Sequence, residues 1–180
     1  MTEGQQPRRG REGAGSPRGG VDSAERLAEQ LAHVLTPSSA IVCVGNQLRG
    51  DDGAGPAVAG KLGAAMPWRV FDTQTAPESF LMKIAAGKPE SVVLIDTLDF
   101  GAAPGAVDLA PAGDVGGQGP STHGPAPIAF LEALGMAHPC PCWVLGIQPQ
   151  RVEFGDSLSP PVEAAVELVV RAFHILASPQ

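Results

Sequence analysis

The chain has 180 residues, 43% of them hydrophobic, which fits one soluble globular domain with a modest tail. Its net charge of −7 argues against a nucleic-acid-binding surface. No apolar run approaches the ~20 residues needed to cross a bilayer, and residues 1–21 lack the apolar centre of a secretory signal, so we expect a cytoplasmic protein without membrane insertion.

The amino-terminal part of the chain divides from the rest by composition. Residues 1–21 are rich in Gly, Pro and Arg and have no hydrophobic pattern, which predicts a disordered tail. Residues 22–36 predict an additional helix, capped by Asp22 or Ser23 and running from Ala24 to Leu35. We expect the remaining residues, 38–178, to form a single domain.

From residue 40 onward, strand-like and helix-like patterns alternate. Strands are predicted over Ala40–Val44, Arg69–Asp72, Ser91–Asp96, Gly105–Leu109 and Trp143–Ile147. Helices are predicted over Gly55–Met66, from Pro77 onward, over Ala126–Leu134, and from Pro160 or Pro161 to Leu176. Residues 113–127 read as a long glycine- and proline-rich loop. The alternation predicts an α/β domain with a mainly parallel sheet and helices on both faces.

The three cysteines do not indicate a disulfide framework. Cys43 lies in a strand that we expect to be buried, where a free thiol acts as a small apolar side chain. The spacing of Cys140 and Cys142 is too short for an easy disulfide, and no second pair is present for a structural zinc site.

Five polar side chains follow the predicted strands, at the edge where open α/β sheets bind their ligands. Asp51 and Asp52 follow the first strand, Asp96 and Asp99 come at the end of the third, and His123 lies in the long loop. If the strands follow a flavodoxin-like order, the first and third are neighbours. Carboxylates and an imidazole together suit a borderline divalent ion such as Ni²⁺, Zn²⁺ or Fe²⁺ better than Ca²⁺ or Mg²⁺.

Each of these residues also has an ordinary structural explanation. Asp51 or Asp52 can cap the helix that begins near Gly53, Asp96 can accept hydrogen bonds from loop amides, and His123 can be a solvated surface residue. A nucleotide site is a rival interpretation of the glycine-rich loop. That loop, however, spells neither G-x-G-x-x-G nor a Walker sequence, and its carboxylates would repel a pyrophosphate.

In five motifs the chain resembles the hydrogenase maturation endopeptidases, most closely their hydrogenase-3-type branch. The motifs are Val44-Gly45-Asn46 with Gly50-Asp51-Asp52-Gly53-Ala54-Gly55-Pro56, Ala76-Pro77-Glu78, Ile95-Asp96 with Asp99, Thr122-His123, and Leu145-Gly146-Ile147-Gln148-Pro149. The resemblance covers about residues 40–172. Family members usually begin near the first strand, so the additional amino-terminal helix departs from the family pattern.

The resemblance implies a three-layer α/β sandwich with a five-stranded twisted sheet. It further implies an endopeptidase, of a family often classed as aspartic-type, that removes the C-terminal extension of the large-subunit precursor of a NiFe hydrogenase. Asp52, Asp96 and His123 match the family's nickel ligands, and Asp51 and Asp99 are candidate helpers. The nickel is expected to be presented by the precursor.

Two other functions are compatible with these residues. One is a non-proteolytic metal- or nucleotide-binding module on the same fold, since a fold alone does not determine function. The other is a maturation chaperone that holds the precursor without cutting it. The sequence does not determine an oligomeric state for any of these three candidate functions.

Overall fold

The computed structural model describes residue 21 and residues 23–115, 126–155 and 157–178. Residues 1–20 of the predicted disordered tail therefore lie outside the described residues, as does His123. The last residue assigned to that tail, Val21, is buried, and its backbone N–H donates to the carbonyl of Val107 at 2.8 Å. Val21 is therefore held against the sheet although the composition places it in the tail.

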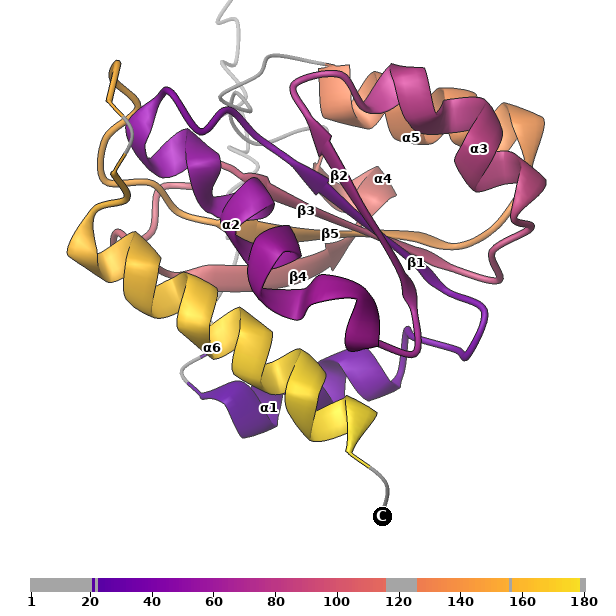
Figure 1. The fold of residues 1–180 in the computed structure, drawn as a ribbon, viewed down its shortest axis with the longest axis horizontal. Helices are drawn as coiled ribbons and strands as arrows, with labels where there is room; N and C mark the ends of the chain where they lie inside the picture. The colour runs from indigo at the N-terminus through magenta and orange to yellow at the C-terminus, as the bar shows by residue number, and fades with distance from the viewer. Residues whose placement is uncertain (1–20, 22, 116–125, 156, 179–180) are drawn as a thin grey trace, which may run out of the picture.

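A five-stranded sheet in the order β2-β1-β3-β5-β4 forms the centre of the molecule (Figure 1). The strands are β1 Ala40–Val44, β2 Arg69–Gln74, β3 Val92–Thr97, β4 Val107–Pro111 and β5 Cys142–Ile147. The pairs β1–β2, β1–β3 and β3–β5 are parallel, whereas β4 runs antiparallel to β5 at the edge. The predicted mainly parallel α/β sheet and the neighbouring first and third strands are therefore confirmed.

The flavodoxin-like strand order is wrong for the last two strands, because β5 rather than β4 lies next to β3. Residues 98–106, which connect β3 to β4, contain no helix. A parallel neighbour needs a crossover of about a dozen residues or more, usually a helix. The short connection instead leads to the outer edge of the sheet, where β4 pairs antiparallel with β5. The position next to β3 is occupied by β5.

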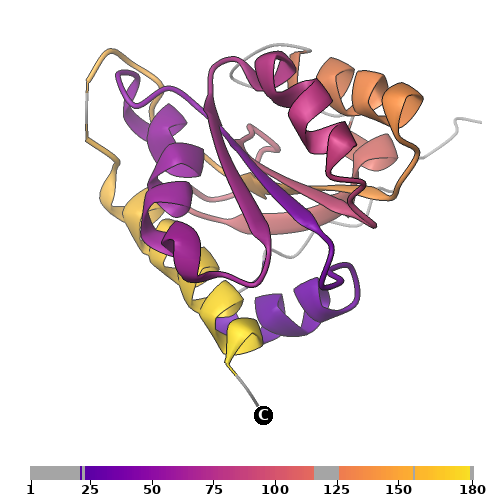
Figure 2. The same cartoon turned by 45° about the vertical axis from the view of Figure 1, so that its right-hand side comes forward.

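Helices cover both faces of the sheet and complete three layers (Figures 1 and 2). The first face carries α1 Ala24–Ala32, α2 Ala54–Leu62 and α6 Pro160–Ala177; the second carries α3 Leu81–Ala86 and α5 Ala126–Ala137. Shorter helical turns are η1 Gly50–Gly53, η2 Gly63–Ala65, η3 Pro77–Phe80 and α4 Ala112–Val115. Helix α4 corrects the predicted loop over residues 113–127, whose central residues, 116–125, lie outside the described part.

Strands β1 and β3 are buried on both faces, as their runs of successive apolar residues predict. In β1, Ile41 and Cys43 join the cluster beneath α1, α2 and α6, whereas Val42 and its alternate neighbours join the cluster beneath α3 and α5. Burial raises the pKa of the Cys43 thiol far above its ordinary value, so this cysteine is an inert part of the core. Sheet and helices therefore form two hydrophobic layers that share the same strands.

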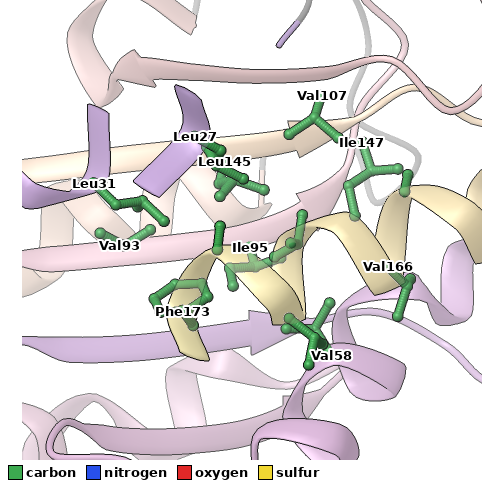
Figure 3. Packing of buried hydrophobic residues seen from close by; sticks show 14 of the residues in the cluster. Leu27, Leu31, Val58, Val93, Ile95, Val107, Leu145, Ile147, Val166 and Phe173 are labelled. Carbon is green, nitrogen blue, oxygen red and sulfur yellow. The ribbon is translucent and has the colours of Figure 1, made fainter. Parts of the chain in front are cut away.

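The additional amino-terminal helix belongs to the core. The Ser23 hydroxyl accepts a hydrogen bond from the backbone N–H of Arg26 and caps α1. Leu27 and Leu31 are fully buried, and Figure 3 shows them in the same cluster as Val93 and Phe173. The helix ends at Ala32, shorter than predicted, and it packs against α6 and the sheet. No helix within the described ranges is long and apolar enough to cross a membrane.

The packing of α1 can be tested by removing one buried side chain. We expect Leu31→Ala to lower the free energy of unfolding by about 2–5 kcal/mol, because it removes apolar contacts and leaves a cavity. Leu48→Ala is the matched control, since Leu48 is exposed and its truncation is expected to cost less than about 0.5 kcal/mol. Urea denaturation measures both values. Equal stabilities would contradict the packing of α1 on this face.

Candidate functional site

The loop after β1 and the end of β3 are packed tightly against one another. A Cβ atom on Gly55 would collide with the carbonyl of Val44 and would lie 3.0 Å from that of Ile95. Gly45 has a φ of 153°, and a Cβ there would collide with the carbonyl oxygen of Asp52. The glycines therefore let the first turn of α2 sit directly on the carboxyl ends of the two strands.

Asp52 and Asp96 lie on either side of a hydrogen bond that joins these two segments. The Thr97 hydroxyl donates to the backbone carbonyl of Asp51 at 2.9 Å, so the residues next to this contact are Asp52 and Asp96. Both side chains are fully buried. Oδ1 of Asp96 also accepts a hydrogen bond from the backbone N–H of Thr97 at 2.8 Å. A buried carboxylate requires a proton, hydrogen-bond donors or a cation to offset its desolvation.

Asp51 faces a different segment, the loop that precedes α6. One carboxylate oxygen accepts from the backbone N–H of Ser159 at 2.6 Å. The other accepts from the N–H groups of Gln150 and Arg151, both at 2.8 Å, and from the Ser159 hydroxyl at 2.9 Å. The carboxylate of Asp51 therefore binds Gln150, Arg151 and Ser159 to the loop that carries Asp52.

These hydrogen bonds determine the charge of Asp51. Burial acts to raise its pKa, but the three backbone N–H donors and the Ser159 hydroxyl outweigh burial and lower the pKa below its ordinary value. The carboxylate is thus ionised and accepts four hydrogen bonds, which suits a structural anchor, and its role as a helper in the reaction stays a prediction. The alternative of a helix cap is wrong for Asp51, since the N-cap of α2 is Gly53 and no side chain caps that helix.

Asp99, the other candidate helper, is an exposed residue in the loop after β3. Its Oδ1 accepts from the side-chain amide of Gln148 at 3.0 Å and from the backbone N–H of Gly101 at 3.1 Å. The bond from Gln148 and then that from Gly101 lower the pKa of Asp99. Asp99 therefore helps to hold its own loop in place, and a role as helper in the reaction stays a prediction.

The sequence reasoning gave Gln148 no role beyond its place in a motif. Gln148 is buried, and its Oε1 accepts from the backbone N–H groups of Phe100 and Ala102 at 2.9 and 3.2 Å. Its own backbone exchanges hydrogen bonds with Gly105 and Ala106. The sequence signal that could have indicated a structural role for Gln148 is a polar residue directly after an apolar strand and before a proline. Gln148 fixes the loop that follows Asp96.

The structure thus brings two of the three predicted metal ligands, Asp52 and Asp96, to one edge of the sheet. The third, His123, lies outside the described residues, so its position stays a prediction. Within the described ranges, no group of three His, Cys, Asp or Glu side chains is arranged to hold a metal ion. Cys140 and Cys142 are free thiols with raised pKa values, caused first by burial, and they play no part at this edge.

Known proteins are similar to this chain in both sequence and fold. The profile of the hydrogenase maturation protease family matches residues 57–174. The hydrogenase 3 maturation protease of Escherichia coli (strain K12) is 34% identical over 136 residues, which cover 72% of this chain and 84% of that protein. The profile match includes Asp96 and Gln148 but begins after the loop that carries Asp51 and Asp52.

Solved structures give the same relationship. The crystal structure of a NiFe hydrogenase maturation protease, HycI from Thermococcus kodakarensis KOD1, has a TM-score of 0.72 at 27% identity, covering 85% of this chain and 99% of that one. The solution structure of the endopeptidase HycI from Escherichia coli has a TM-score of 0.64 at 30% identity, covering 74% and 86%. The predicted three-layer α/β fold and the resemblance to the family are confirmed.

The anchoring role of Asp51 predicts a pH-dependent loss of stability in Asp51→Asn. The substitution removes a charge that accepts four hydrogen bonds and points an amide N–H₂ at donors, so we expect a loss of about 2–4 kcal/mol at pH 7. Because the folded pKa of Asp51 is lowered, this stabilisation is present above its unfolded pKa and disappears as pH falls through the folded value.

Urea denaturation of wild type and Asp51→Asn between pH 7 and pH 3 measures this difference. The gap between the two proteins should narrow below about pH 4, the unfolded pKa of an aspartate. Asp99→Asn is the control, since that carboxylate is exposed and should contribute less than about 1 kcal/mol. A gap for Asp51→Asn that is constant with pH would contradict the ionised anchor.

Proposed function

Because the chain belongs to the hydrogenase maturation protease family, we propose that it is an endopeptidase that removes the C-terminal extension of a nickel-loaded NiFe hydrogenase large-subunit precursor. The observation that supports a metal-directed site is the pair of fully buried carboxylates, Asp52 and Asp96, on either side of the contact between η1 and β3. The precursor is the partner, and its nickel is part of the substrate.

The chemistry of the donor set fits nickel. Asp52 and Asp96 supply carboxylate oxygens, and His123 supplies an imidazole nitrogen, a mixed set that a borderline ion such as Ni²⁺ accepts. Both carboxylates are withdrawn from water, and a cation is attracted more strongly in such surroundings than in solvent. Binding of the precursor's nickel by these residues makes recognition depend on metal loading.

The residues of this chain would position the scissile bond and the metal relative to one another. Asp51 fixes the loop that carries Asp52, and Gln148 fixes the loop that follows Asp96, so the two ligands are held in place before the substrate arrives. When bound, nickel would polarise the scissile carbonyl or a nearby water, as a Lewis acid does. Cleavage of that peptide bond then releases the C-terminal extension.

Substitution of the three ligands tests this proposal. We expect Asp52→Asn, Asp96→Asn and His123→Ala each to slow processing of the nickel-loaded precursor by at least about 100-fold, because each removes a ligand to the metal. Shortening of the precursor is followed on a gel and by intact mass. Asp114→Asn is the control, since Asp114 is exposed on α4. That helix follows β4, which runs antiparallel to β5, so it lies at the end of the sheet opposite the carboxyl ends of β1 and β3.

Normal processing by all three variants would rule out the assigned site. A stable complex of wild type and precursor without any change in precursor mass would instead favour a maturation chaperone. Binding of a nucleotide in the absence of metal would favour the non-proteolytic module. Thermal unfolding of each variant separates loss of function from loss of fold.

Nickel dependence is a second test. Precursor prepared without nickel should not be shortened, and addition of Ni²⁺ to it should restore shortening, since the metal completes the recognised substrate. The same mass measurement detects both results. Equal processing rates with and without nickel would contradict recognition through the metal and leave a protease with a different trigger.

A further inference from the structure

Two free thiols lie next to each other where β5 begins. Cys142 is the first residue of β5, and Cys140 stands two residues before it. The proline between them favours an extended backbone at Cys140, and side chains two residues apart in an extended chain share one face. The Cys142 thiol donates to the carbonyl oxygen of Cys140 at 3.5 Å, and the two side chains also hydrogen-bond to one another. The chain therefore holds both sulfur atoms close together.

The surroundings of this pair of thiols are fixed and largely apolar. The backbone N–H of Val92 donates to the carbonyl of Pro141 at 2.9 Å, and Val92 is also the partner of Cys142 in the ladder between β3 and β5. Both cysteines pack against the hydrophobic cluster beneath α3 and α5. Each residue is only partly buried, so a small ion can reach the pair from solvent.

Both thiols carry their protons at neutral pH. Burial is the first cause that raises the pKa of Cys140 above its ordinary value, and burial together with the neighbouring Cys140 raises the pKa of Cys142 to about 12. Because the thiolate is the reactive form of cysteine, these side chains are poor nucleophiles. A metal ion that binds thiolate sulfur strongly can still displace the protons. The pair is therefore better suited to holding a metal than to covalent catalysis.

The number and type of donor atoms determine which ion suits the pair. Thiolate sulfur selects soft ions, among them Cu⁺ and Zn²⁺. Structural zinc takes four ligands, yet in the part of the chain that the structure describes no group of three His, Cys, Asp or Glu side chains could hold a metal. His138 is close in sequence, but its Nε2–H donates to the carbonyl of Pro89 at 2.9 Å. Two sulfur donors suit Cu⁺, which accepts two-coordinate binding.

We propose that Cys140 and Cys142 form a binding site for one Cu⁺ ion. Binding forms two Cu–S bonds and breaks both S–H bonds, and the two protons pass to solvent. No electron is transferred, so the step needs no oxidant or reductant. The site lies at the amino end of β5, whereas Asp96 pairs with Gly146, about 13 Å further along that strand. The copper site is therefore separate from the candidate nickel ligands and does not depend on the proposed function.

Retention of copper against a competing chelator tests this site. Reduced full-length protein is titrated anaerobically with Cu⁺ in the presence of bicinchoninate, whose copper complex is coloured. We expect wild type to retain about one Cu⁺ per chain, and Cys140→Ser and Cys142→Ser each to retain less than about 0.1, because one thiolate does not compete with the chelator. Cys43→Ala is the matched control, since it removes a thiol that is fully buried, and it should retain as much copper as wild type.

X-ray absorption at the copper edge adds a measurement on wild type that needs no substitution. We expect sulfur neighbours around the copper and no nitrogen from an imidazole, and His138→Ala should retain copper normally. Loss of copper from wild type to the chelator would overturn the site. Retention by the two serine variants equal to that of wild type, or nitrogen ligands in the spectrum, would overturn it as well.

Discussion

The buried carboxylate of Asp51 is the contact on which the rest of this edge of the molecule depends. It accepts hydrogen bonds from three backbone N–H groups and one hydroxyl of the loop before α6, and its lowered pKa keeps it ionised. Without it, the donors would be left buried and unpaired, at a cost far larger than that of an exposed hydrogen bond. Its neighbour Asp52 is therefore held in position by a structural residue.

Two consequences of this anchor meet at the carboxyl edge of the sheet. Inward, the contact between Thr97 and the Asp51 carbonyl brings the loop of Asp52 to the end of β3, where Asp96 lies. Outward, backbone hydrogen bonds of Gly155 with Leu48 and Gly50 keep the loop after β1 beside the loop before α6. The loop of Asp52 is thus fixed both to the end of β3 and to the loop before α6.

Much of the fold could be predicted from the sequence, because the central strands contain continuous apolar runs and the chain alternates between strands and helices. The order of β4 and β5 could not, since it depends on the helix-free connection over residues 98–106 and on an antiparallel pairing that no local pattern encodes. The anchoring role of Asp51 was equally hidden, although the family resemblance separates Asp52, as a candidate ligand, from Asp51. The two residues are adjacent and chemically identical, and the partners that distinguish them lie about a hundred residues further along the chain.

Nickel X-ray absorption spectroscopy of the loaded precursor, alone and mixed with this protein, tests the central claim most directly. We expect the nickel to gain oxygen and nitrogen ligands when wild type is added and to keep its original ligands when an Asp52→Asn/Asp96→Asn variant is added. A spectrum that wild type leaves unchanged, in a mixture shown by calorimetry to form the complex, would contradict direct binding of the precursor's metal by these carboxylates.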